Sequence, residues 1–117
     1  MEIRETLETL GVDYEVLKMR FSNNENLLSK FILKFPDDVC YARLQTAVQT
    51  KDYEAVLMEA HSLKGVAANL GFETLFLRCS ELVQYLRDGH TEHVEELNNA
   101  ITAAYNIIID GLAMIDK

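Results

Sequence analysis

Three residues near the middle of the chain combine a nucleophile, a cation and a position without a side chain. Lys64 follows His61 by three residues, and Gly65 follows it by four. On a helix, residues three and four apart are neighbours on one face, so both would lie one turn beyond the imidazole. Neutral imidazole is a nucleophile near physiological pH, and a cation beside it would stabilise an anion carried by the ring. The spacing therefore suits covalent chemistry on His61.

Gly65 is the unusual member of this set. Glycine in a helix interior costs about 0.8–1 kcal/mol relative to alanine, which calls for a compensating role. A bulky residue at this position would cover the His61 ring from the following turn, whereas glycine lets another protein approach it. The His61 side chain points about 120° away from the core face of its helix at 100° per residue. That core face is expected to contain Tyr53, Val56, Ala60, Leu63, Ala67 and Leu70.

The elements that position these residues are expected to be helices. The chain has one proline and five glycines, and alternating β-branched segments bounded by turn residues are absent. This pattern predicts an all-α protein. Long amphipathic segments joined by a few residues predict an antiparallel up-down-up-down four-helix bundle. Short N-terminal cover helices precede it, and residues 1–117 form one domain.

Capping and breaking residues set the expected boundaries. Gly11 ends a first short helix and Asp13 caps a second. A capping-box pattern, Ser22-Asn23-Asn24-Glu25, opens a helix that reaches Phe35, and Pro36 falls in the first turn of the next helix. Asp52 caps the helix that carries His61, and Gly71 ends it. The four long helices are expected over about 36–50, 52–70, 72–88 and 94–115.

Charge and composition exclude several classes of function. Eleven basic against nineteen acidic residues give a net charge of −8, the wrong sign for neutralising nucleic-acid phosphates or binding anionic membranes. The longest apolar stretches fall far short of the ~20 residues that span a bilayer, and the acid-rich N-terminus does not resemble a signal peptide. We expect a cytoplasmic monomer in which Cys40 and Cys79 are buried thiols.

The segment from His61 to Gly71 resembles the signature of histidine phosphotransfer (HPt) domains. The motif is H-x-L-K-G with a further glycine ten residues after the histidine, here preceded by Ala60. The likeness covers nearly the whole chain and includes Arg20-Phe21, Phe35, Asp52, Cys79 and Leu82. The resemblance implies a four-helix bundle whose exposed histidine exchanges a phosphoryl group with aspartates of receiver domains.

Carried over by position, the resemblance implies that His61 is the phosphoacceptor, Lys64 stabilises the phosphoryl charge and Gly65 provides clearance. The partners implied are response-regulator receiver domains and a sensor or hybrid histidine kinase. The receiver would supply Mg²⁺, so no cofactor is expected on this chain. A Gly-rich phosphate loop of the G-x-x-x-x-G-K-[ST] type is absent, so we expect a phosphohistidine carrier without ATP-dependent kinase activity.

The position level with His61 on the following helix departs from the family pattern. The two helices are expected to be antiparallel, and pairing residues equidistant from position 72 places His61 opposite Val83. Many family members carry Glu or Gln there, able to bond the imidazole. Here Gln84 lies one residue later, so either Gln84 reaches back or water or another group orients the ring. The expected receiver-docking patch around His61 comprises Leu57, Met58, Ala68, Phe76, Val83 and Gln84.

Other functions are weighed against this one. His90 and His93 lie near Glu92 and Glu96, but a loop and a helix first turn explain them, so no metal site is expected. Phosphoacceptor domains of histidine kinases typically follow the histidine with an acid and, five residues on, a proline. This chain has Ser62 and Val66 there. The remaining alternative is a non-catalytic helical adaptor that keeps the scaffold, in which His61 would be dispensable.

Overall fold

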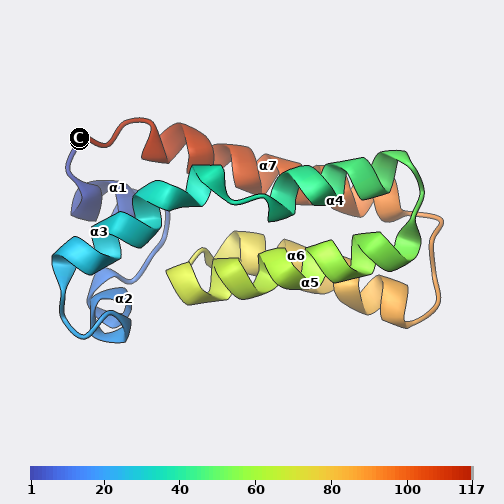
Figure 1. Cartoon of the computed structure of the whole chain (residues 1–117), viewed down its shortest axis with the longest axis horizontal. Coiled ribbons are helices and arrows are strands. Elements are labelled where there is room, and N and C mark those ends of the chain that lie inside the picture. Colours follow the sequence, from blue (N-terminus) through green and yellow to red (C-terminus); the bar gives the residue numbers. More distant parts are fainter. Residues whose placement is uncertain (117) are drawn as a thin grey trace.

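The chain folds into an elongated bundle of helices, described over residues 1–116 in a computed structural model with extents of 41 × 23 × 20 Å. Within these residues no strand occurs, and the predicted all-α class is confirmed. Figure 1 shows α4 lying along α7, and α5 lying beside α6. The elements in order are α1 (Ile3–Thr9), α2 (Tyr14–Arg20), α3 (Glu25–Lys34), η1 (Phe35–Asp37), α4 (Cys40–Gln49), α5 (Tyr53–Leu70), α6 (Glu73–Arg87) and α7 (Val94–Leu112).

Helix α5 packs against both of its neighbours in sequence. Its closest associations are with α6 and α4, and α6 in turn packs against α7. Short antiparallel connections between successive helices bring about this order. Helices α1 and α2 lie at one end of the bundle, where α1 also contacts α7 (Figure 1). The helix predicted to carry His61 is therefore held along its length and is covered at one end by the N-terminal helices.

Capping residues define the helix that carries His61 as the sequence predicts. The Asp52 carboxylate accepts a hydrogen bond from the Ala55 backbone N–H, which satisfies one of the free donors of the first turn. Gly71 ends α5 with φ +79°, in the left-handed region that favours glycine. Asp13 caps α2 in the same way, by accepting from the Val16 N–H. These boundaries confirm the expected positions of both caps.

Three boundaries differ from the sequence prediction, one of them the end of α7, which lies at Leu112 and not near residue 115. The cap of α3 is Asn24, whose side chain accepts from the Leu27 N–H, because Ser22 and Asn23 adopt φ of +57° and +59° in the preceding turn. Pro36 belongs to the separate turn η1 and not to the first turn of α4. Helix α4 begins only at Cys40, whose N–H donates to Asp38 Oδ1 at 2.8 Å. Helices α3 and α4 are thus separate helices, joined by a bend that contains η1.

The core runs through the bundle and continues under the N-terminal helices. Leu7, Tyr14 and Leu17 of α1 and α2 are buried, which fits their expected role as cover. Phe35 of η1 contacts the rings of Phe72 and Tyr105 at centroid distances of 5.1 and 5.7 Å. These contacts join the bend to the start of α6 and to α7.

The two cysteines differ in burial, which corrects one expectation. Cys79 is fully buried, and burial raises the pKa of its thiol to about 12. Cys40 is only partly buried; burial and then the neighbouring Asp38 raise the pKa of its thiol to about 11. Both thiols are protonated at neutral pH.

Across residues 1–116, none of the helices is long and apolar enough to cross a membrane.

Candidate functional site

His61 lies on the outward face of α5. The opposite face is buried through Val56, Ala60, Leu63, Ala67 and Leu70, whereas His61 itself is exposed. Tyr53, which was expected on the core face, is only half-buried at the start of the helix. The helix thus stays anchored by one apolar stripe and presents the imidazole to solvent from the other side.

Open space adjoins the ring one turn further on. Gly65 is exposed, and a Cβ atom placed on it would meet no atom outside its own helix backbone within 4 Å. It is absent from the positive-φ residues, so its backbone conformation does not require glycine. Ala68, three residues later, is also exposed. What distinguishes Gly65 is the clear surface that it leaves beside the imidazole.

Lys64 lies on the side of α5 that faces α6. Its ammonium Nζ is 5.5 Å from the centroid of the Phe76 ring, within the range of a cation–π contact. Both side chains are half-buried. The ion pairs among residues 1–116 join other groups, so Lys64 carries a positive charge without a carboxylate partner in that part of the chain.

Val83 does not belong to a docking surface, which corrects the sequence prediction. Its side chain is 1% exposed because its position on α6 faces the core and not the solvent. Gln84 is exposed, but its amide Nε2 donates to Asp88 Oδ1 at 2.8 Å, one turn further along α6. In this structure Gln84 therefore bonds to its own helix and does not reach back to His61.

The remaining residues of the expected docking patch are at the surface in varying degree. Met58, one turn before His61, is 59% exposed. Leu57 and Phe76 are half-buried, and Ala68 is exposed. The surface around the imidazole thus combines apolar side chains with the small residues of α5. Such a mixture of apolar and open positions is typical of protein interaction surfaces.

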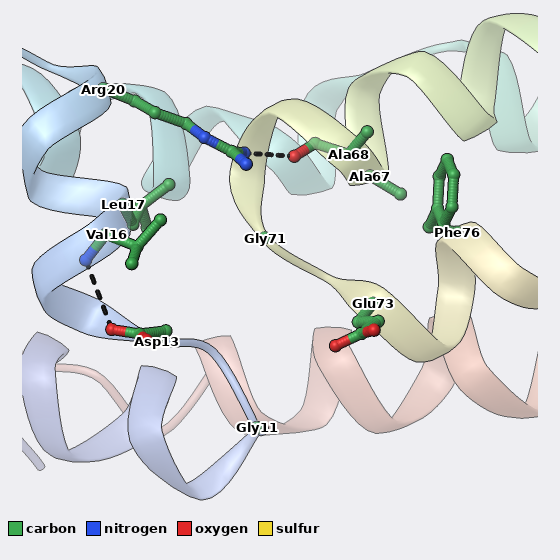
Figure 2. A pocket seen from close by; sticks show the side chains of 10 residues that line it. All are labelled: Gly11, Asp13, Val16, Leu17, Arg20, Ala67, Ala68, Gly71, Glu73 and Phe76. Carbon is green, nitrogen blue, oxygen red and sulfur yellow. Dashed lines mark hydrogen bonds between the residues drawn. The ribbon is translucent and has the colours of Figure 1, made fainter.

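A cleft borders this surface on the side of α2. It has a volume of about 420 Å³, and Figure 2 shows Ala68 and Phe76 on one side of it and Val16 and Leu17 of α2 on the other. Val16 belongs to the predicted cover helix α2 but is 48% exposed. Sequence reasoning missed this wall of the cleft because periodicity alone cannot distinguish an apolar residue that covers the core from one beside a groove.

Arg20 links α2 to the end of α5. Its guanidinium Nη1 donates to the carbonyl oxygens of Ala68 and Asn69, the former shown as a dashed line in Figure 2. The last carbonyls of a helix lack partners within the helix and carry partial negative charge, so an arginine satisfies and stabilises them. Arg20 was noted in the sequence only as part of a motif, and the structure gives it this positioning role.

The other two histidines have a different environment. The backbone N–H of His93 donates to the Tyr85 hydroxyl at 2.9 Å, and that hydroxyl donates to Glu92 at 2.9 Å. The His93 ring pairs with Glu96 at 3.1 Å, and the His90 ring lies 5.3 Å from the Tyr85 ring centroid. Within residues 1–116, no group of three or more His, Cys, Asp and Glu side chains could hold a metal ion.

Comparison with known families agrees with this architecture. Residues 26–111 match the family model described as Hpt domain. Because the match spans most of the chain, the protein belongs to the Hpt domain family, whose members are helical-bundle carriers in histidine phosphotransfer and not kinases. Its general role is therefore phosphotransfer in a phosphorelay. Comparison with curated proteins and with solved structures found no match.

Proposed function

We propose that His61 accepts a phosphoryl group from the aspartyl phosphate of a receiver domain and passes it to the aspartate of another. The observation that carries this proposal is the exposed imidazole on an anchored helix, with a cation and an open position one turn away. An anchored helix fixes the ring without covering it. Positioning and charge stabilisation are the main requirements of phosphoryl transfer.

The transfer needs no further chemical group on this chain. A neutral imidazole nitrogen of His61 attacks the phosphorus, and the P–N bond forms as the P–O bond to the aspartyl carboxylate breaks. The carboxylate leaves as an anion, and the reverse reaction delivers the phosphoryl group to a second aspartate. Any Mg²⁺ that neutralises the phosphoryl oxygens would belong to the receiver domain.

Lys64 supplies the charge on the carrier side. Residues three apart on a helix lie on the same face, so its flexible ammonium group can reach a phosphoryl group on His61. The net charge of the chain is −8, and a phosphoryl group adds further negative charge. A local cation therefore offsets repulsion where the anion is formed.

Around His61, we propose that the receiver docks on the surface formed by Leu57, Met58, Ala68 and Phe76. Gly65 allows the receiver's acidic pocket to come close to the ring, and the cleft beside α2 continues this surface. Val83 is excluded from the surface by its burial. The partners are receiver domains and a sensor or hybrid histidine kinase, and the carrier acts as a cytoplasmic monomer without transferring phosphate from ATP.

The test is to incubate the protein with phosphorylated receiver domains and to follow the phosphoryl group. We expect an acid-labile, alkali-stable label on the wild-type protein and none on His61→Gln, which keeps a polar side chain at an exposed position. Incubation with labelled ATP alone should leave both proteins unlabelled. Label that persists in the variant, or a wild type that no phosphorylated receiver labels, would contradict the proposal and favour a helical adaptor.

A further inference from the structure

Lys64 is held by an aromatic ring where most surface lysines find a carboxylate or water. The ring belongs to Phe76 of α6, at 5.5 Å from Nζ, and both side chains are half-buried. The positive charge of Lys64 also acts on the buried Cys79 one turn along α6, since it opposes the rise that burial causes in the pKa of that thiol. The ammonium group of Lys64 therefore lies against α6.

Within residues 1–116, no acidic residue forms an ion pair with this cation. Helix positions three and four residues from Lys64 are Ala60, His61, Ala67 and Ala68, which include no acid. On α6, the Glu81 carboxylate is paired with Arg78 at 2.7 Å. The chain has nineteen acidic residues, yet Lys64 has an aromatic neighbour in place of a salt bridge within residues 1–116.

A ring and a carboxylate would affect the site differently. A carboxylate partner would cancel the charge of Lys64 and compete with a phosphoryl group for it. The face of a phenyl ring attracts the ammonium through its quadrupole and leaves the net charge in place. The ring also restricts the many rotamers of a lysine side chain, so less entropy is lost when the ammonium engages an anion.

We propose that Phe76 is a positioning residue, whose ring holds the Lys64 ammonium beside His61 with its charge uncompensated, ready to stabilise the phosphoryl group. This inference rests on the proposed function of His61. It gives Phe76 a role through Lys64 in addition to its proposed contact with the receiver. The two roles make different predictions, because a positioning residue changes the rate of transfer within the complex and a docking residue changes the affinity of the complex.

The first measurement concerns the unphosphorylated protein and does not depend on transfer. In the NMR spectrum, the ε-methylene protons of Lys64 should be shifted upfield by the Phe76 ring. Phe76→Leu keeps an apolar side chain of similar volume and should remove the shift, whereas Phe76→Tyr should retain it. A Lys64 resonance unaffected by Phe76→Leu would overturn the inference whether or not His61 carries phosphate.

The second measurement is the transfer rate from a phosphorylated receiver at increasing carrier concentration. We expect Phe76→Leu to lower the maximal rate about two- to five-fold, the factor that corresponds to an exposed cation–π contact. The half-saturating concentration should change little, because leucine keeps an apolar contact for the receiver. Phe76→Tyr should restore the rate. Phe31→Leu, which removes a partly exposed ring from α3, is the matched control and should have no effect.

A double-mutant cycle separates the two roles of Phe76. In a Lys64→Gln background, Phe76→Leu should have no further effect on the maximal rate, because the cation that it positions is gone. If Phe76→Leu slows transfer equally in both backgrounds, or raises only the half-saturating concentration, Phe76 acts only through its contact with the receiver and the inference is wrong. A wild type that accepts no label would instead contradict the proposed function, and the NMR shift would still decide whether Phe76 holds Lys64.

Discussion

The three histidines of the chain lie in two contrasting regions. His61 is exposed in the middle of α5, a helix packed along its length between α4 and α6. His90 and His93 lie in the connection between α6 and α7, where both rings approach Tyr85 and the His93 ring pairs with Glu96. The rigid element thus presents a ring with open space beside it, and the loop holds its rings through local contacts.

We infer that this difference separates the proposed phosphoacceptor from two histidines with a structural role. The Tyr85 hydroxyl and Glu92 join the loop to the end of α6, and hydrogen bonds from the Glu92 and Thr91 backbone and from the Tyr85 hydroxyl lower the pKa of Glu92. This hydrogen-bond network holds together the connection between α6 and α7. Around His61, small residues on the following turn leave a surface that a partner can approach. Residue type alone does not distinguish the two regions, and the supporting element does.

The largest expected effect on phosphoryl transfer comes from replacing the histidines by glutamine, one region at a time. His61→Gln should abolish phosphoryl acceptance, because the nucleophile is lost. The double variant His90→Gln/His93→Gln should keep the wild-type rate within about two-fold, since loop side chains remote from the site change positioning little. The measurement is transfer from a labelled receiver with all variants at one concentration. A strong loss in the loop variant would break the contrast between the regions.

A second variant fills the space beside the His61 ring. Leucine at position 65 would project back over the preceding turn, because helical side chains point toward the N-terminus. We expect Gly65→Leu to slow transfer about 100-fold, the order of loss that small misplacements of reacting groups cause. Equal folding by circular dichroism is the control. Unchanged transfer would show that the clearance at Gly65 has no function.

The variant Gly65→Ala adds a smaller side chain and tests how much stability the protein loses by having glycine at this position. A Cβ at this position meets no atom within 4 Å, so alanine gains its helix propensity without strain. The free energy of unfolding should rise by about 0.8–1 kcal/mol, as measured by urea denaturation. A fall in stability would mean that glycine is required for packing, and the functional explanation of this residue would lose its basis.

In the loop region, Tyr85→Phe removes the hydroxyl that joins His93 and Glu92. Hydrogen exchange at the His93 amide should become faster, because its acceptor at 2.9 Å is lost. Transfer to His61 should be unchanged. Slower transfer in this variant would show that the loop and the α5 site are coupled.

The smallest effect concerns the buried thiol of Cys79. Its pKa in the folded protein is raised to about 12 from an ordinary value of 9.0, so the folded state binds the proton more tightly than the unfolded state does. Its contribution to stability is complete below pH 9.0 and decreases as the pH rises toward about 12. Urea midpoints at pH 8 and pH 10.5 should differ less in Cys79→Ala than in wild type. Equal differences would contradict this assignment.

Much of the fold was predictable because it depends on local signals. The caps at Asp13, Asp52 and Gly71 act within one turn, and amphipathic periodicity identifies the buried stripe of α5. The cap of α3 was placed two residues early because Ser22 and Asn24 are both good capping residues. The conformation of the intervening turn decides between them, and the sequence pattern does not specify it.

The candidate site was predictable only where it depends on a single helix. The exposure of His61 and the clearance at Gly65 follow from positions on α5. The burial of Val83 depends on how α6 rotates against α5, and small rotations decide whether a boundary residue faces the core. The contact of Lys64 with Phe76 and the bond of Arg20 to Ala68 are tertiary, so one-dimensional spacing could not establish them.

The measurement that tests the central claim most directly is mass-spectrometric mapping of the phosphoryl group on wild-type protein labelled by a phosphorylated receiver. Proteolytic digestion at alkaline pH without heating preserves phosphohistidine. Sequencing of the labelled peptides then distinguishes the three histidines. The account predicts that all of the label lies on His61. Label on His90, on His93 or on an acidic residue would contradict it.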